Sequence, residues 1–248
     1  MKSIDKFFKI LNLLEVNSNL RLKEISDILN LDKATVHRFL KILLEQEFVR
    51  KNFETNRYSL GLRFLNISTK IIEGLNIKTI AQPYLAELKE LTGETIHLAM
   101  FDGSNVIYID KIESTKSVRI GSRIGSKAQF YCTALGKTIL SFQDSKVKIK
   151  IFDDFKFIPM TKNTITDKKT LLQELNEIKR NGYGVDNSEN KEEVCCIAAP
   201  IFNHDKNVNY AISISAIKTR TNVNKLLEYK EVLIEKCNII SKKMGFPK

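Results

Sequence analysis

The sequence predicts an α+β protein in two parts, a winged helix-turn-helix and a larger domain built on an antiparallel sheet. Within residues 20–61, two short amphipathic helices are separated by a Leu31-Asp32 break and followed by a β-hairpin. From Thr92-Gly93 onward, the hydrophobic period changes from that of helices to that of strands. Such strands alternating with segregated helices are typical of an α+β domain. The expected ranges are 1–61 for the winged helix-turn-helix, 62–78 for a linker helix and 79–248 for the second domain.

The helices of the first part each have one apolar face. Ile25, Ile28 and Leu29 recur at helical spacing in the first helix of the pair. Asp32 is suited to cap the second, because its carboxylate can accept a hydrogen bond from a first-turn N–H. That helix is expected from Lys33 to about Glu45, with Val36, Phe39, Leu40 and Leu43 in the core. A preceding helix is expected to complete the core through Ile4, Phe7, Phe8, Leu11 and Leu14.

The opposite face of the second helix is cationic, which suits major-groove recognition by a helix-turn-helix. The hairpin, over 48–51 and 57–60, adds basic residues that can contact phosphates beside the groove. An ordinary helical hairpin with solvated charges is the alternative, and a wing of the right order and length weighs against it. The candidate DNA-binding residues are Lys33, Ala34, Thr35, His37, Arg38, Lys41, Arg50, Lys51 and Arg57.

Composition sets broad limits. A length of 248 residues suggests two domains, and no apolar run approaches the roughly 20 residues of a membrane span. Without an export signal or C-x-x-C spacing, the four cysteines are expected to be reduced thiols in a cytoplasmic protein. The net charge is +11, but residues 1–60 hold 11 basic against 8 acidic residues. The DNA-binding prediction therefore depends on where the charges lie, not on their sum.

The remaining elements follow from periodicity. Helices are expected near 62–75, over 81–91 with Pro83 in the first turn, from Thr133 to about 142, over 167–180 and from about 223 to 244. Strands are expected over 94–101, 105–113, 118–124, 194–202 and 208–217. Asn181-Gly182 is a plausible helix stop.

Eight segments, in order and at fitting intervals, resemble the IclR family of bacterial transcription regulators. They are ATVHRFLKIL (34–43), RYSLGLRFL (57–65), TGETIHLA (92–99), TALGKTIL (133–140), NTIT (163–166), RNGYGVDNSE (180–189), CIAAPIF (196–202) and AISISA (211–216). The resemblance implies a winged helix-turn-helix, a linker helix and a GAF-like effector domain. It also implies a homodimer or homotetramer on double-stranded, palindromic operator DNA. Ala34, Phe53 and Asn56 depart from residues common in the family, which affects single contacts rather than the fold.

The resemblance further implies a repressor of a catabolic operon that responds to a small carboxylate, for example a sugar acid such as 2-keto-3-deoxygluconate. An activator of the same architecture is the alternative. No cofactor is expected.

Several residues of the second domain could converge on that effector. Ser213 and Ser215 share one face of a strand, and Asp186 is expected in a loop. The helix start at Ala134-Leu135 offers free backbone N–H groups to a carboxylate. Each feature also has an ordinary structural explanation, and the family pattern favours the pocket. The candidate effector-binding residues are Ile120, Ala128, Ala134, Leu135, Asp186, Val194, Cys196, Ser213 and Ser215.

A thiol-dependent redox enzyme is the competing class. A nucleophilic thiolate needs a base or a positive neighbourhood. The three histidines, His37, His97 and His204, lie in a predicted helix, strand and turn, so the sequence shows no Cys–His pair. No metal-ligand spacing is present either. The sequence therefore favours a regulator over an enzyme.

Overall fold

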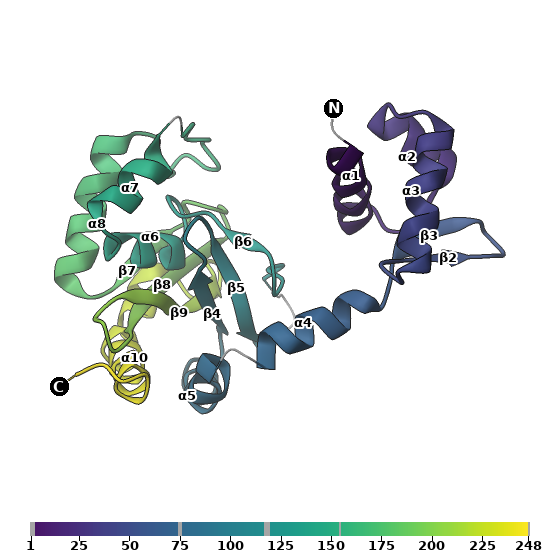
Figure 1. Ribbon diagram of the computed structural model, residues 1–248. Helices are drawn as coiled ribbons and strands as arrows, with labels where there is room; N and C mark the ends of the chain where they lie inside the picture. The colour runs from purple at the N-terminus through teal and green to yellow at the C-terminus, as the bar shows by residue number, and fades with distance from the viewer. Residues whose placement is uncertain (1–2, 74–75, 117–119, 154, 248) are drawn as a thin grey trace. The chain divides into compact units, whose positions relative to one another are not determined.

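The computed structural model describes residues 3–73, 76–116, 120–153 and 155–247 (Figure 1). The chain divides into two compact units, Met1–Leu75 and Asn76–Lys248. Within the described ranges, no helix combines the length and apolarity needed to cross a bilayer.

The first unit is a winged helix-turn-helix. Its elements are α1 (Ser3–Val16), β1 (Leu20–Arg21), α2 (Leu22–Leu29), α3 (Lys33–Glu45), β2 (Val49–Asn52), β3 (Arg57–Leu60) and α4 (Arg63–Glu73). The three strands form an antiparallel sheet in the order β1-β3-β2. The two-residue strand β1 was not predicted, since so short a segment has no readable period.

The bounds of α3 and its buried residues are as predicted. The Asp32 carboxylate accepts a hydrogen bond from the Thr35 amide at 2.7 Å. Interaction with the Thr35 side chain, and then this amide bond, lowers the pKa of Asp32. Val36, Phe39, Leu40 and Leu43 are buried against the other two helices. At the wing turn, Asn56 has a φ of 55°, a conformation that asparagine tolerates.

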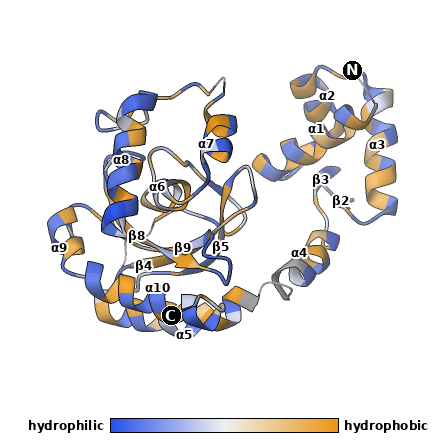
Figure 2. Ribbon diagram, turned by 60° about the vertical axis from the view of Figure 1, so that its left-hand side comes forward, coloured by the Kyte–Doolittle hydropathy of each residue, from blue (hydrophilic) through white to orange (hydrophobic). Residues whose placement is uncertain are grey.

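Three residues of this unit that were predicted to lie in the core are exposed. Ile4, Phe8 and Ile28 are 68%, 54% and 56% exposed, whereas Ile10, Leu14 and Ile25 are buried. The apolar residues of α1 and α2 cover more than one stripe of each helix, and a single contact face buries only one stripe. Figure 2 shows hydrophobic and hydrophilic residues alternating along these ribbons.

The second unit is built on a six-stranded antiparallel sheet of order β6-β5-β4-β9-β8-β7. Its strands are β4 (Thr95–Phe101), β5 (Val106–Ile112), β6 (Lys127–Ala128), β7 (Gly184–Asn187), β8 (Val194–Phe202) and β9 (Val208–Ile217). Helices α5 (Asn76–Thr92) and α10 (Lys230–Lys243) cover one face. Helix α6 (Ala134–Ser141) covers the other and packs against α8 (Lys168–Asn181) (Figure 1). Two short helices, α7 (Ser145–Phe152) and α9 (Val223–Leu227), complete the unit.

Strands β8 and β9 have the predicted bounds, and α8 begins after its Asp167 cap and ends at Gly182, whose φ is 78°. Helix α5 starts five residues earlier than expected, so Pro83 lies inside it rather than in its first turn. The loss of one backbone hydrogen bond at Pro83 is offset by burial of Ile77, Ala81, Leu85 and Leu88. The range expected for the linker helix thus spans α4 and the first residues of α5.

Three more predictions are corrected. The strand expected at 118–124 is a loop over 120–124, and residues 118–119 lie outside the described ranges. Lys111 Nζ donates to the carbonyls of Ile120 and Ser122, which therefore need no strand partner. The expected last helix is interrupted at Glu228-Tyr229. There a hydrogen bond from Tyr229 N to Leu226 O, three residues back, forms a turn that separates α9 from α10. Asp186 lies in the edge strand β7 and not in a loop.

Candidate functional site

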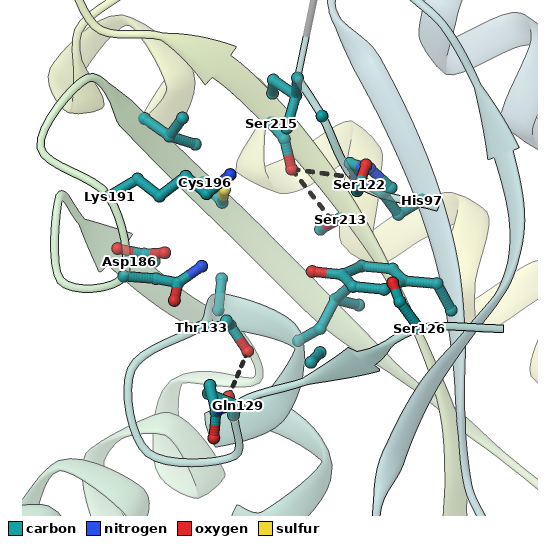
Figure 3. Close-up of a pocket in the computed structure, with 18 of the residues that line it drawn as sticks. His97, Ser122, Ser126, Gln129, Thr133, Asp186, Lys191, Cys196, Ser213 and Ser215 are labelled. Atoms are coloured by element: carbon teal, nitrogen blue, oxygen red, sulfur yellow. Dashed lines mark hydrogen bonds between the residues drawn. The ribbon is translucent and has the colours of Figure 1, made fainter. Parts of the chain in front are cut away.

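A pocket of about 250 Å³ lies between the sheet and the start of α6 (Figure 3). All nine candidate effector-binding residues line it. Strands β6, β7, β8 and β9 supply Ala128, Asp186, Cys196, Ser213 and Ser215, together with Val194. The remaining three are Ile120 in a loop and Ala134 and Leu135 in the first turn of α6.

The sheet side of the pocket is a polar chain. Ser213 Oγ and Ser215 Oγ are 3.3 Å apart, and Ser215 Oγ lies 3.2 Å from His97 Nδ1 (Figure 3). The other ring nitrogen of His97 hydrogen-bonds to Ser122 Oγ at 2.6 Å. Burial, together with the positive charge of Lys111, lowers the pKa of His97 to about 3. His97 is therefore a neutral ring that can relay hydrogen bonds between hydroxyl groups.

The helix side of the pocket presents backbone donors. Thr133 caps α6 by accepting from Gly136 N at 3.0 Å and by donating to Gln129 O at 2.6 Å. Gly136 permits this close approach, since a Cβ there would lie 2.3 Å from Gln129 O. Ala134 and Leu135 lie in the first turn of α6, where backbone N–H groups have no hydrogen-bond acceptor within the helix. With the positive end of the helix dipole, they suit a carboxylate.

Asp186 faces the pocket from β7 (Figure 3) and is 1% exposed. It pairs with Cys196 of β8 and accepts a hydrogen bond from Glu189 N at 2.7 Å. Burial raises the pKa of Asp186 to about 7, against the lowering effect of that hydrogen bond. The carboxyl group is thus protonated in a large share of molecules at neutral pH and can donate a hydrogen bond to an anion.

Other lining residues escaped the sequence analysis. Those with polar side chains are His97, Tyr108, Ser122, Ser126, Lys127, Gln129, Thr133, Asn190 and Lys191, and Gly121 and Met160 complete the wall. A histidine between the apolar residues Ile96 and Leu98 of strand β4 was a usable signal for His97, which pairs in register with Ser213. The loop residues had no such signal, because their approach depends on how the chain returns over the sheet.

The thiols show no sign of activation. Burial raises the pKa of Cys132 to about 12 and that of Cys195 to about 11, and it raises the pKa of Cys196 well above the ordinary value. These thiols are protonated and poorly nucleophilic at neutral pH. Within the part of the chain that the structure describes, no group of three His, Cys, Asp or Glu residues could hold a metal.

The candidate DNA-binding residues lie on α3 and the wing. Lys33, Ala34, His37, Arg38 and Lys41 are exposed on α3, and Thr35 is half-buried. On the wing, Arg50 is exposed with its Nε bonded to Ser59 Oγ at 2.9 Å. Lys51 Nζ lies 5.8 Å from the Phe53 ring centroid and 5.7 Å from that of Tyr58.

Arg57 differs from the other basic residues of the wing. Its guanidinium donates to the Asn19 carbonyl and to Glu24 Oε2, 3.3 Å away. These bonds join β3 to the start of α2. The negative charge of the Glu24 carboxylate also partly neutralises the Arg57 guanidinium, which weakens its attraction for a phosphate.

A winged helix-turn-helix followed by an α+β domain with a polar pocket defines a ligand-responsive class of DNA-binding protein. Comparison with known families agrees. The model for "IclR helix-turn-helix domain" matches residues 3–52, and that for "Bacterial transcriptional regulator IclR C-terminal" matches residues 69–242. The chain belongs to the IclR family and is a DNA-binding transcriptional regulator, not an enzyme.

Individual relatives span nearly the whole chain. It is 33% identical to the regulator KdgR of Escherichia coli, over 99% of this chain and 94% of that protein. It is 34% identical to KipR of Bacillus subtilis, over 99% and 98%. The transcriptional repressor YiaJ of Escherichia coli is 32% identical, over 96% and 87%. The crystal structure of Thermotoga maritima IclR superposes with a TM-score of 0.80 at 34% identity, covering 98% of each chain.

Proposed function

We propose that this regulator is a repressor of a catabolic operon and that a small carboxylate, a keto or sugar acid, releases it from DNA. The observation that carries the effector class is the pocket itself. The first turn of α6 offers backbone N–H groups to a carboxylate, and Asp186, Ser213, Ser215 and the neutral His97 can bond keto or hydroxyl oxygens. The repressor assignment is supported by the name of YiaJ, which is 32% identical.

The protein would act in the cytoplasm as a homodimer or homotetramer on a palindromic operator. Paired recognition helices α3 would occupy half-sites about 34 Å apart, or a multiple of that. The effector would act by binding more tightly to the arrangement that does not fit the operator. Sedimentation of the purified chain with and without operator DNA measures the assembly state.

The effector is tested with a thermal-shift screen of small keto and hydroxy acids that includes 2-keto-3-deoxygluconate, followed by calorimetry. An acid that binds should raise the melting temperature and release the operator in a gel shift. Asp186→Ala should retain operator binding but lose release. Asp205→Ala, at an exposed turn that does not line the pocket, is the matched control and should behave as wild type. Normal release by Asp186→Ala would show that the pocket assignment is wrong.

Repression is tested by deleting the gene and measuring transcription from the operator it binds. A repressor predicts increased transcription in the deletion strain, and added effector should not raise it further. A fall in transcription would instead identify an activator.

A further inference from the structure

A lysine is buried next to the pocket without lining it. Lys137 lies in α6, one turn after the pocket residues Ala134 and Leu135, and is 1% exposed. Its ammonium group contacts both carboxylate oxygens of Glu189, at 2.7 and 2.8 Å. It also contacts Glu174 Oε1 of α8 at 3.0 Å. Burying a charged lysine without such partners would destabilise the fold, and here two carboxylates offset that cost.

Glu189 connects this lysine to the pocket. Its backbone N–H donates to Asp186 Oδ1 at 2.7 Å, and its carboxylate accepts from Asn187 N at 3.4 Å. The segment after Asp186 is therefore held to the start of α6 by the Lys137–Glu189 pair. Asn190 and Lys191, the next two residues, both line the pocket.

Two threonine hydroxyl groups also hydrogen-bond to the backbone of the segment after Asp186. Thr161 Oγ1 donates to Ser188 O at 2.6 Å, and Thr164 Oγ1 donates to Glu189 O at 2.6 Å. These threonines fix the backbone around residue 189 but carry no charge. Unlike the threonine bonds, the Lys137–Glu189 ion pair places charges between α6 and the segment that follows Asp186.

We propose that Lys137 and Glu189 are positioning residues of the effector pocket: they fix the spacing between the start of α6 and Asp186, and their charges set the field in which Asp186 meets an anionic ligand. Neither residue touches the ligand. This inference rests on the effector pocket described under the proposed function.

The two charges act on Asp186 in opposite senses. The Glu189 carboxylate raises the pKa of Asp186 and the Lys137 ammonium lowers it, while burial makes the largest contribution. The thiols of Cys132, Cys195 and Cys196 and the phenol of Tyr108 also interact with Asp186, and these four groups are neutral at pH 7. Two charged side chains, Lys127 and Lys191, line the same pocket and are unchanged in the variants below. Replacing Glu189 by Gln should therefore lower the pKa of Asp186.

Ligand affinity should follow this ionisation. An anionic ligand favours the protonated Asp186, so affinity is highest below the pKa of Asp186 and falls as pH rises through about 7. In Glu189→Gln the fall should begin at a lower pH, because the charge that raises the pKa of Asp186 is gone. Loss of packing alone would weaken binding at every pH without moving this midpoint.

The first measurement needs no ligand. The side-chain carboxyl carbon of Asp186 is titrated by NMR in the full chain, for wild type, Glu189→Gln and the control Glu174→Gln. Glu174 shares Lys137 but lies on α8 and is 29% exposed, and among the described residues no hydrogen bond or ion pair joins it to Asp186. The midpoint should be near 7 in wild type, lower in Glu189→Gln and near wild type in Glu174→Gln. Equal midpoints in wild type and Glu189→Gln would overturn the inference.

The second measurement is calorimetric binding of 2-keto-3-deoxygluconate between pH 6 and 8. A double variant, Lys137→Met with Glu189→Leu, removes the pair without leaving a buried charge and should remain folded. It should bind at least about tenfold more weakly and still bind operator DNA. Wild-type affinity in this variant would overturn the positioning role. If wild type itself binds none of the acids, the proposed function fails, while the titration still decides whether the pair acts on Asp186.

Discussion

Arg38 and Arg57 carry the same charge but differ in what holds them. Arg38 is exposed on α3, with its guanidinium carbon 5.3 Å from the Phe39 ring centroid. Arg57 is bonded to the Asn19 carbonyl and to Glu24. A side chain already engaged within the protein gives up those bonds when it contacts DNA. The sequence does not distinguish the two arginines, because Asn19 and Glu24, the partners of Arg57, are distant from it in sequence.

Arg38→Ala should weaken operator binding by about 1–3 kcal/mol if Arg38 contacts a base. Arg57→Ala should cost less affinity and should lower thermal stability, because it removes the link between β3 and α2. Gel shifts at matched salt, with melting curves of both variants, compare the two. Equal losses of affinity would contradict this distinction.

Ser188 combines two unfavourable features. Its φ is 60°, a left-handed conformation that costs energy for any residue with a Cβ, and its buried hydroxyl has no hydrogen-bond partner among the described residues. Ser188→Gly should therefore stabilise the protein by about 1 kcal/mol in urea unfolding. Ser188→Ala removes the hydroxyl but keeps the Cβ, so it should stabilise less. A larger gain from alanine would show that backbone strain is not the main cost.

At the scale of elements, the fold of the pocket depends on the start of α6. Thr133 accepts from Gly136 N and donates to Gln129 O, so one hydroxyl holds both the helix and the preceding loop. Thr133 is 6% exposed, and water cannot easily replace these bonds.

Thr133→Ala should destabilise the protein by about 1–2 kcal/mol and weaken effector binding, because the N–H groups of the first turn lose their fixed position. Thr133→Ser keeps the hydroxyl and is the control. Urea unfolding and calorimetry measure the two effects. Equal stability of the alanine and serine variants would mean that the cap contributes little.

Elements with strong local signals were predictable. Helix α3 has a cap and an apolar stripe, and β8 and β9 are long runs of β-favouring residues. Strands β1, β6 and β7 are two to four residues long and were missed or misplaced, because pairing with a neighbour, and not local sequence, makes them strands. The motif around Asp186 indicates a site residue, but strand β7, in which it lies, has no local signal.

At the scale of the whole molecule, the division after residue 75 predicts separable activities. A fragment of residues 76–248 contains the six-stranded sheet, its covering helices and, among the described residues, all those that line the pocket. It should fold cooperatively and bind the same acid as the full chain, with no affinity for the operator. Circular dichroism, calorimetry and gel shifts check these points. A fragment that folds but does not bind the acid would show that residues 1–75 contribute to the pocket.

The sequence by itself determined the family, the order of the main elements, the helix proposed to contact DNA and nine residues of the pocket. These features follow from local periodicity, helix capping and short motifs, all of which can be recognised in a single sequence. The tertiary structure decided that His97 joins the serines, that Lys137 and Glu189 hold the segment behind Asp186, and that Arg57 is tied to Glu24. It also decided the pKa of Asp186, because burial and neighbouring charge exist only once distant segments have packed together.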